Sequence, residues 1–338
     1  MASVDVVVPC YQYGRFLREC VDSILSQGVS DLRVLIIDNA STDNSLEVAR
    51  QLAAEDKRVE VVAHARNVGA TASYNEGIDW ASAEYFIELD ADDLLAPGCL
   101  SRALACLEAN PNLAFTYGLE AFRLPDGTTQ LHSKHSDDAS WQVVPGGDFI
   151  ARTCSLACNH VDGSTVVRRT AVQKRVGYYR PSMTYADDLE MWLRLASAGD
   201  VASIAATQGI RRIHSAQISE AYRSNTVLTY VEYEKAFDSF FMHDGYYISN
   251  ARHMHAIARY RIAESAYWCA IYKFICGHRR LSYNLLKFAI ARFPSMALAP
   301  PFGFMWRMED WQKRKIVELL SKAGRRLASF APQSQRGG

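Results

Sequence analysis

The sequence has no excess of charge of either sign, because its 338 residues include 37 lysines and arginines and 37 aspartates and glutamates. Such a balance gives no overall attraction to nucleic acid, and we expect no nucleic-acid partner. With 49% hydrophobic and 22% charged residues, the chain is too apolar to be intrinsically disordered. It is long enough for one large domain or two modest ones.

Cysteine pairs with redox or metal-binding spacing are also missing, since the eight cysteines are scattered and no CxxC occurs. We therefore expect reduced thiols and a cytoplasmic protein without a disulfide framework. Cys154, Cys158 and His160 lack a fourth ligand at suitable spacing, so no zinc site is predicted there.

Long apolar runs are broken by charge or proline. Asp5 interrupts the first one, and the apolar stretch over 288–308 contains Arg292 and Pro294. Neither a signal peptide nor a spanning helix is predicted from these stretches. Residues 279–326, the basic tail, are rich in Lys and Arg and contain few acidic residues. This tail fits either a helix lying on anionic lipid at the inner face of the membrane or an ordinary solvated helix.

Strand and helix patterns alternate through the first part of the chain. Buried strands are expected over 4–9, 32–37, 59–62 and 85–89, with amphipathic helices between them. This order predicts an α/β protein with a mainly parallel sheet flanked by helices, whose ligands bind at the carboxyl ends of the strands.

The pattern changes in the second half. A hairpin is expected around Pro125-Asp126-Gly127, and from about residue 222 only helices are expected, over 227–242, 251–276, 280–293 and 309–328. We place a domain boundary near residue 220, between an α/β domain over 1–220 and an all-helical C-terminal domain over 221–338.

The strongest chemical signal is the run of carboxylates in Glu88-Leu89-Asp90-Ala91-Asp92-Asp93, where an apolar strand ends. Carboxylates this close repel one another unless a cation lies among them, and oxygen ligands suit Mg²⁺ or Mn²⁺ shared with phosphate oxygens. The alternative is a solvated turn that caps the next helix.

Two other strand ends carry polar or aromatic residues. Asp38 and Asn39 close the second strand, although Asp38 could instead cap the turn that follows. Tyr11 follows the first strand and offers a ring for a base or sugar, unless it is a core residue. Asp187 and Glu190 have capping-box spacing at the start of another helix, which leaves Asp188 without an obvious structural partner.

Several motifs, taken in order, carry a family resemblance. They are VDVVVPCYQYGRFLRECVDSILSQ, IIDNASTDNS, ARNVGATASYNEGI, YFIELDADDLLAPG, DDLEMWLRLASAG and RRIHSAQIS. With them the chain resembles family 2 glycosyltransferases over roughly residues 3–220. The resemblance implies a GT-A, Rossmann-like fold, with a nucleotide-sugar half over about 1–118 and an acceptor half over about 119–220.

The resemblance also implies residue roles. It assigns the nucleotide sugar to Pro9, Tyr11, Asp38, Asn39, Arg66, Asn67, Asp90, Ala91 and Asp92. The family commonly has an aspartate where this chain has Asn39, and that aspartate takes the N3 proton of uracil. An amide oxygen can also accept that proton, but the amide NH₂ adds a donor, so uracil and thymine stay open.

For the reaction itself, the resemblance implies Mn²⁺ or Mg²⁺ held by Asp92, Asp93 and His214. Asp188 matches the catalytic base, which takes the proton of the acceptor hydroxyl as it attacks the anomeric carbon and inverts its configuration. On the acceptor side the resemblance points to Asp187, Trp192 and His160.

These observations predict a metal-dependent inverting glycosyltransferase that uses a UDP- or dTDP-sugar and a glycan or lipid-linked acceptor, in surface polysaccharide or glycoconjugate synthesis. One alternative is a nucleotidyltransferase, but the loop CYQYG lacks the glycine-rich, basic character suited to a triphosphate. Another is a catalytically inactive GT-A-like binding protein, against which the joint presence of Asp90, Asp92, Asp188 and His214 argues.

Overall fold

A computed structural model describes residues 3–214, 226–301 and 303. Among these residues, ten strands form one mixed sheet in the order β3-β2-β1-β4-β9-β6-β10-β5, with β7 paired to β6 and β8 to β10. The strands are β1 (Ser3–Cys10), β2 (Asp31–Asp38), β3 (Val59–Ala63), β4 (Tyr85–Glu88), β5 (Leu94–Leu95), β6 (Leu113–Arg123), β7 (Thr129–Gln130), β8 (Gln142–Val144), β9 (Val167–Arg169) and β10 (Asp200–Arg212).

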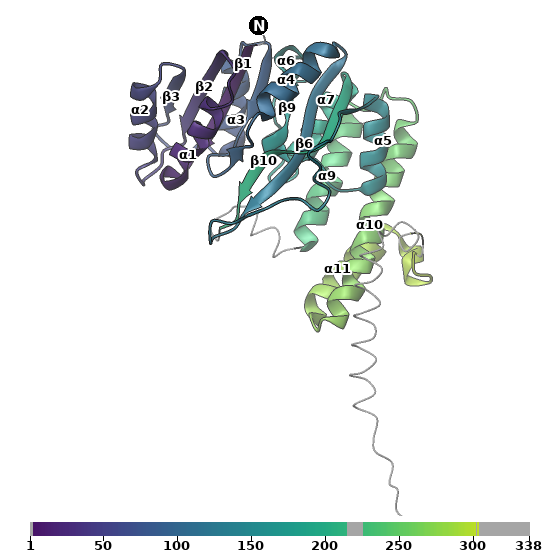
Figure 1. Ribbon diagram of the computed structural model, residues 1–338. Helices are drawn as coiled ribbons and strands as arrows, with labels where there is room; N and C mark the ends of the chain where they lie inside the picture. Colours follow the sequence, from purple (N-terminus) through teal and green to yellow (C-terminus); the bar gives the residue numbers. More distant parts are fainter. Residues whose placement is uncertain (1–2, 215–225, 302, 304–338) are drawn as a thin grey trace, which may run out of the picture.

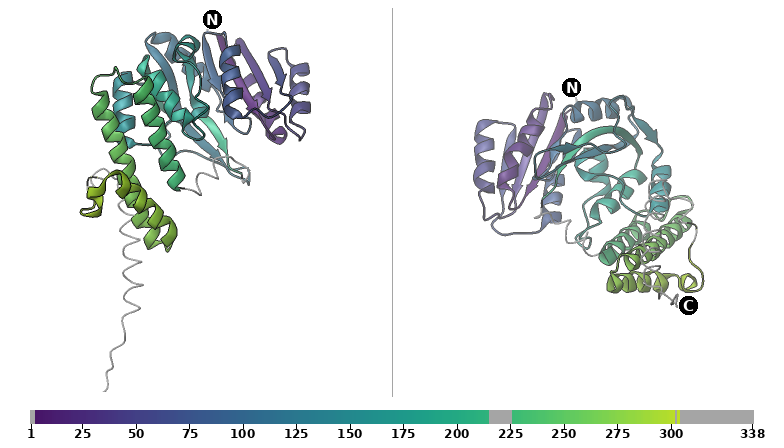
Figure 2. Two further views of the ribbon diagram at one scale, coloured as in Figure 1. Left: turned by 180° about the vertical axis from the view of Figure 1, so that it is seen from behind. Right: turned by 60° about the horizontal axis from the view of Figure 1, so that its bottom comes forward.

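Helices lie on both faces of this sheet, and further helices group at the end away from α2 (Figure 1, Figure 2). They are α1 (Gly14–Leu25), α2 (Ser45–Glu55), α3 (Ala70–Trp80), α4 (Cys99–Ala109), α5 (Gly146–Leu156), α6 (Thr170–Val176), α7 (Asp187–Ser197), α9 (Thr226–His243), α10 (Ala251–Ile275) and α11 (Arg279–Arg292), with short 3₁₀ turns η1 (Gly163–Thr165) and η2 (Pro294–Ala297). The predicted α/β fold is confirmed.

The valines of β1 divide the core into two layers. Val6 and Val8 join the apolar cluster that includes α1, α2 and α4, whereas Val7 joins the cluster that includes α3. Neighbouring side chains of a strand point to opposite faces, so a continuous apolar strand can be buried on both sides. Gly77 of α3 permits close packing on this strand, because a Cβ there would lie 2.5 Å from a methyl group of Val7.

The sheet brings the ends of several strands to one edge. β1 pairs in parallel with β2 and β4, and Cys10 lies level with Asp38. Strand β9 was not predicted from the sequence, because it has three residues and no recognisable alternation. It runs antiparallel to both β4 and β6 and so links these two strands within the sheet. The predicted hairpin is present as β6 and β7.

The C-terminal helices share an apolar core with the sheet. α9 packs on α7, and α10 packs on α5, α9 and α11 (Figure 1). Phe237, Ala258 and Leu285 belong to the same buried apolar cluster as Val7 of β1. The helices predicted over 227–242, 251–276 and 280–293 are confirmed within one or two residues.

Three predictions from the sequence fall outside the described residues. These are the domain boundary near residue 220, the segment Ser215–Ser219 after His214, and the helix over 309–328 with half of the basic tail. In the part of the chain that is described, none of the helices combines the length and apolarity that crossing a membrane requires.

Removing a core side chain that links α9 to the sheet domain tests this continuity. Phe237 is fully buried, and Phe237→Ala should lower the free energy of unfolding by about 3–5 kcal/mol through lost burial and the cavity left behind. Met242 in the same helix is 70% exposed, so Met242→Ala is the matched control and should change stability little. Chemical denaturation measures both, and equal effects would contradict the shared core.

Candidate active site

A cleft of about 800 Å³ opens at the carboxyl edge of the sheet. It is lined by residues from the ends of β1, β4 and β10, from α3, from the start of α7, and from α9: Pro9, Cys10, Tyr11, Gln12, Tyr13, Asn39, Asn67, Ala70, Thr71, Ser73, Tyr74, Asp90, Ala91, Asp92, Asp93, Asn159, Val161, Asp162, Gly163, Thr184, Tyr185, Asp187, Asp188, Arg211 and Tyr233. Most of the predicted site residues therefore converge on one cleft.

The loop after β1 is fixed by the loop after β2. The backbone N–H groups of Gln12, Tyr13 and Gly14 donate to Ser41 Oγ (3.0 Å), Ser45 Oγ (3.1 Å) and Asp43 Oδ2 (3.1 Å). These bonds hold Tyr11 on the cleft wall with 44% of its surface exposed. This exposure excludes the alternative that Tyr11 is a core residue. The Tyr11 ring is available to stack on a base.

Of the four polar residues expected around the base, two line the cleft and two do not. Asn39 and Asn67 line it. Asp38 is 1% exposed and accepts from the backbone N–H of Ser41 at 3.2 Å, which is the turn-capping role that the sequence left open. Arg66 is exposed and lies outside the lining of the cleft.

The carboxylates after β4 face different partners. Asp90 is exposed to the cleft and accepts from Tyr74 Oη at 2.9 Å, whereas Asp92 Oδ2 lies 3.0 Å from His214 Nε2. Asp93 Oδ1 accepts from the backbone N–H of Arg212 at 3.1 Å. Surrounding protein atoms and the charge of Asp92 raise the pKa of Asp90 to about 6, and the same two causes raise the pKa of Asp93 well above its usual range.

These residues fit a divalent cation only with help from the substrate. Within the described residues, no three His, Cys, Asp or Glu side chains are arranged as a metal site. Mg²⁺ and Mn²⁺ often take one or two protein carboxylates and complete their shell with phosphate oxygens and water. Asp92 and His214 can supply such a partial shell, and His214 Nδ1 is buried without a partner among the described atoms.

A charged cluster between β6 and β10 was not predicted from the sequence. Arg211 of β10 lies in the cleft, and its Nε is 3.1 Å from Glu120 Oε2 of β6. Burial and the charge of Asp162 raise the pKa of Glu120 to about 7. Arg211 is the first residue of the RRIH string, so a basic residue shortly before His214 was the signal that could have pointed to it.

Asp188 lies in the cleft at the first turn of α7. Its Oδ2 accepts from Asn159 Nδ2 at 2.6 Å, and its Oδ1 accepts from the backbone N–H of Leu189 at 2.6 Å. Burial, followed by the charge of Asp187, raises the pKa of Asp188 to about 8. A carboxyl with a raised pKa can hold a proton near neutral pH, as a general base must after it has acted.

The predicted capping box is not formed. The residue before α7 is Ala186, whose side chain makes no cap hydrogen bond. Glu190 instead pairs with Arg180 at 2.7 Å and with Arg194 at 2.8 Å. Asp188 also has a structural partner, Asn159, which the sequence did not reveal because the two are far apart along the chain.

Two residues expected on the acceptor side lie beneath the cleft instead. Trp192 is 2% exposed and packs on Phe115 at a ring distance of 5.9 Å, because the apolar face of α7 turns toward the sheet. His160 packs on Phe149 at 5.2 Å, and burial lowers its pKa to about 4, so it is neutral. Neither lines the cleft, whereas Asp187 does.

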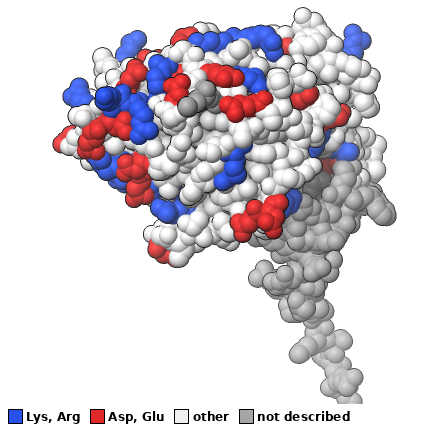
Figure 3. Space-filling view, turned by 45° about the horizontal axis from the view of Figure 1, so that its top comes forward, with Lys and Arg blue, Asp and Glu red and all other residues white. Residues whose placement is uncertain are grey.

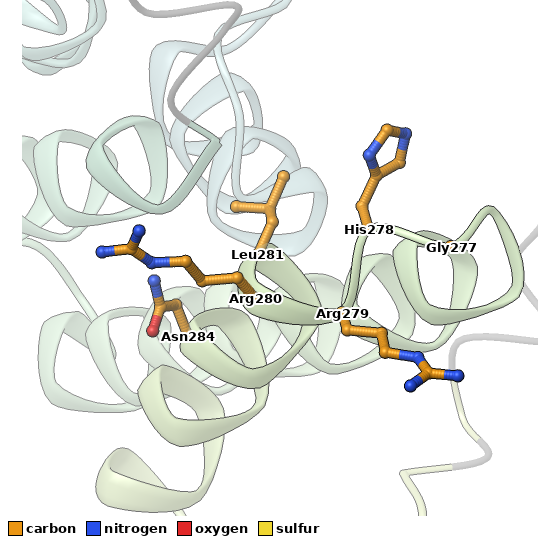
Figure 4. Close-up of a pocket in the computed structure, with 6 residues that line it drawn as sticks. All are labelled: Gly277, His278, Arg279, Arg280, Leu281 and Asn284. Carbon is orange, nitrogen blue, oxygen red and sulfur yellow. The ribbon is translucent and has the colours of Figure 1, made fainter.

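Other parts of the described surface are weaker candidates for a functional site. A hollow of about 570 Å³ lies at the turn between α10 and α11, lined by Gly277, His278, Arg279, Arg280, Leu281 and Asn284. Figure 4 shows that Arg279 and Arg280 point away from each other, so they do not converge on one ligand. On the face shown in Figure 3, basic and acidic side chains are interspersed.

The fold is that of the GT-A glycosyltransferases. S. aureus TarS 1-349 in complex with UDP-GlcNAc superimposes with a TM-score of 0.55 over 88% of this chain and 92% of that one, at 14% identity. At this identity the likeness concerns the fold alone.

Sequence comparison supplies the family. The model of glycosyl transferase family 2 matches residues 5–176 of the 338, more than half of the chain, and the protein belongs to that family. An uncharacterized glycosyltransferase of Haemophilus influenzae is 24% identical over 65% of this chain and 68% of its own length. The chondroitin synthase of Pasteurella multocida is 34% identical, but the match covers 37% of this chain and only 13% of that protein. The chain is thus a glycosyltransferase.

The raised pKa of Asp188 makes a prediction about stability. Because the folded state holds the Asp188 proton up to about pH 8 and the unfolded state releases it near pH 4, the free energy of unfolding should fall as pH rises between these values. Asp188→Asn removes this pH dependence. The free energy of unfolding of the variant, compared with that of the unsubstituted protein, should therefore rise by on the order of 1–3 kcal/mol between pH 5 and pH 8.

Chemical denaturation at both pH values measures this difference. Asp31→Asn is the control, because Asp31 is exposed. A stability difference for Asp188→Asn that is the same at pH 5 and at pH 8 would show that Asp188 titrates normally.

Proposed function

We propose that this family 2 glycosyltransferase transfers a sugar from a UDP- or dTDP-sugar to a hydroxyl group of a glycan or lipid-linked acceptor, in surface polysaccharide or glycoconjugate synthesis. The observation that carries the proposal is that Asp188 and the strand-end carboxylates Asp90 and Asp92 line one cleft. The excess of Lys and Arg over residues 279–326 supports a place at the inner face of the membrane.

In the proposed reaction Asp188 is the general base. Its carboxylate accepts the proton of the acceptor hydroxyl while that oxygen forms a bond to the anomeric carbon. The bond from this carbon to the diphosphate oxygen breaks, and its electron pair leaves with the nucleoside diphosphate. Attack from the face opposite the leaving group inverts the anomeric configuration. Asn159 orients the base through its 2.6 Å bond to Asp188 Oδ2.

The donor is proposed to lie along the ends of β1 and β4. Tyr11 offers a ring face for the base, and Asn39 and Asn67 lie on the same wall. TarS has been solved with UDP-GlcNAc and with UDP, and a chondroitin synthase is among the relatives, which supports a nucleotide sugar and a polysaccharide product. The sugar itself is decided by the shape of the cleft rather than by these residues.

A divalent cation, Mn²⁺ or Mg²⁺, belongs to the proposal as a cofactor held by Asp92 and His214, with Asp93 behind them. When bound, it stabilises the negative charge that develops on the departing diphosphate. Asp92 and His214 approach each other to 3.0 Å, which supports a shared ligand role. Arg211 adds a permanent positive charge on the far side of the carboxylates.

Two substitutions separate catalysis from binding. Asp188→Asn should reduce kcat by about 10²- to 10⁴-fold and leave donor binding nearly unchanged, because the base acts only in the chemical step. Asp92→Asn should weaken donor binding in the presence of Mn²⁺. Thermal stabilisation by UDP- and dTDP-sugars, with and without Mn²⁺, and product formation measure the two effects. Full turnover by Asp188→Asn would refute the base assignment.

The pH dependence of the reaction should follow the protonation of Asp188. Because its pKa is raised to about 8, the carboxylate is mostly protonated at pH 6 and cannot accept the hydroxyl proton. kcat/KM should therefore rise with pH, reach about half of its final value near pH 8 and level off above about pH 9. Initial rates between about pH 6 and pH 9 test this expectation, and a flat profile would contradict it.

A further inference from the structure

The orientation of the Asn39 amide is fixed by the protein. Asn39 is 4% exposed, and its Oδ1 accepts from the backbone N–H of Val68 at 2.9 Å. A backbone N–H can only donate, so the atom that it contacts must be the carbonyl oxygen rather than the NH₂ group. Turning the amide over would leave two donors facing each other in a buried place, which is costly.

The second lone pair of the same oxygen is also used. His64 Nδ1 lies 3.0 Å from Asn39 Oδ1, and His64 Nε2 lies 2.6 Å from Glu76 Oε2. The imidazole ring thus lies between the Asn39 oxygen and the Glu76 carboxylate, and its Nδ1 can donate to the Asn39 oxygen. Glu76 and His64 therefore hold the Asn39 oxygen away from any ligand.

The amide nitrogen of Asn39 contacts Asn67, which also lines the cleft. Asn39 Nδ2 donates one hydrogen to Asn67 Oδ1 at 3.1 Å, and Asn67 Oδ1 also accepts from the backbone N–H of Gly69 at 2.9 Å. Within the described residues no acceptor is recorded for the second hydrogen, and Asn39 lines the cleft. Asn39 thus presents a donor rather than an acceptor.

We propose that Asn39, held by His64 and Glu76, recognises the nucleobase of the donor as a hydrogen-bond donor and reads an acceptor atom of the base. The inference rests on the proposed function, which places the base beside Asn39. Uracil and thymine offer carbonyl oxygens and an N3–H group, whereas cytosine offers a bare N3 acceptor in the same position. An amide NH₂ group can donate a hydrogen bond to each of these bases, but it cannot accept one from the N3–H of uracil.

Binding of UDP, dTDP and CDP to the full-length protein with Mn²⁺, measured by calorimetry, tests this polarity. The unsubstituted protein should bind UDP and CDP within about tenfold of each other, since each base offers an acceptor. Asn39→Asp places a carboxylate oxygen where the NH₂ group was. That oxygen accepts from N3–H of uracil and repels N3 of cytosine, so the ratio of the CDP Kd to the UDP Kd should rise at least tenfold.

His64→Leu removes one of the two hydrogen bonds that hold the Asn39 oxygen. The ratio of the CDP Kd to the UDP Kd should then rise about threefold, because the Asn39 oxygen can turn toward the N3–H of uracil. Glu76→Gln is a milder second variant with the same expected direction. His255→Leu is the matched control, since His255 Nε2 lies 2.6 Å from Asp238 Oδ1 on the C-terminal helices, and it should leave the ratio unchanged.

Three results would overturn these assignments. A preference of the unsubstituted protein for UDP over CDP of more than about a hundredfold, unaltered in Asn39→Asp, would show that Asn39 does not act as the proposed donor. An unchanged ratio in both His64→Leu and Glu76→Gln would remove the holding role. If UDP, dTDP and CDP all fail to bind, the proposed function falls and the inference falls with it.

Discussion

The site depends on one buried ion pair between Glu88 at the end of β4 and Arg168 of β9. Tyr179 Oη donates to the same carboxylate at 2.7 Å, and the guanidinium of Arg168 lies over the rings of Phe86 (4.6 Å) and Trp192 (5.6 Å). This single cluster therefore ties β4, which leads into Asp90, to α7, which carries Asp188. Removing one partner would leave the other charged and buried without compensation, which typically costs about 3–5 kcal/mol.

The electrostatics of the cleft follow from that framework. Carboxyl groups from the turn after β4 and from the start of α7 are held close together, and the surrounding protein atoms and mutual repulsion raise the pKa values of Asp90 and Asp187 to about 6 and that of Asp188 to about 8. Such a cleft disfavours negative charge until a cation enters it. The distribution of raised pKa values suits a site in which one carboxyl group must exchange a proton while its neighbours stay ionised.

The sequence predicted the parts of the fold and site that depend on local patterns. Apolar strands followed by polar turns place Tyr11, Asn39 and Asp90 at one edge, and the start of α7 places Asp188 there. The sequence did not reveal partners that are distant along the chain, such as Asn159 for Asp188. It also misplaced Trp192, because the helical pattern shows which face is apolar but does not show what that face packs against. The short antiparallel strand β9 carried too few residues to show a pattern.

The C-terminal helices constrain how this enzyme can evolve. Because α9 packs on α7 and Phe237 shares a core with the sheet, these helices are not an exchangeable attachment. A recombination event that replaced the chain after β10 would expose the outer face of the helix that carries Asp188 to water. New acceptor specificity is therefore more accessible through substitutions in the cleft-lining residues of α9, such as Tyr233, than through exchange of the whole segment.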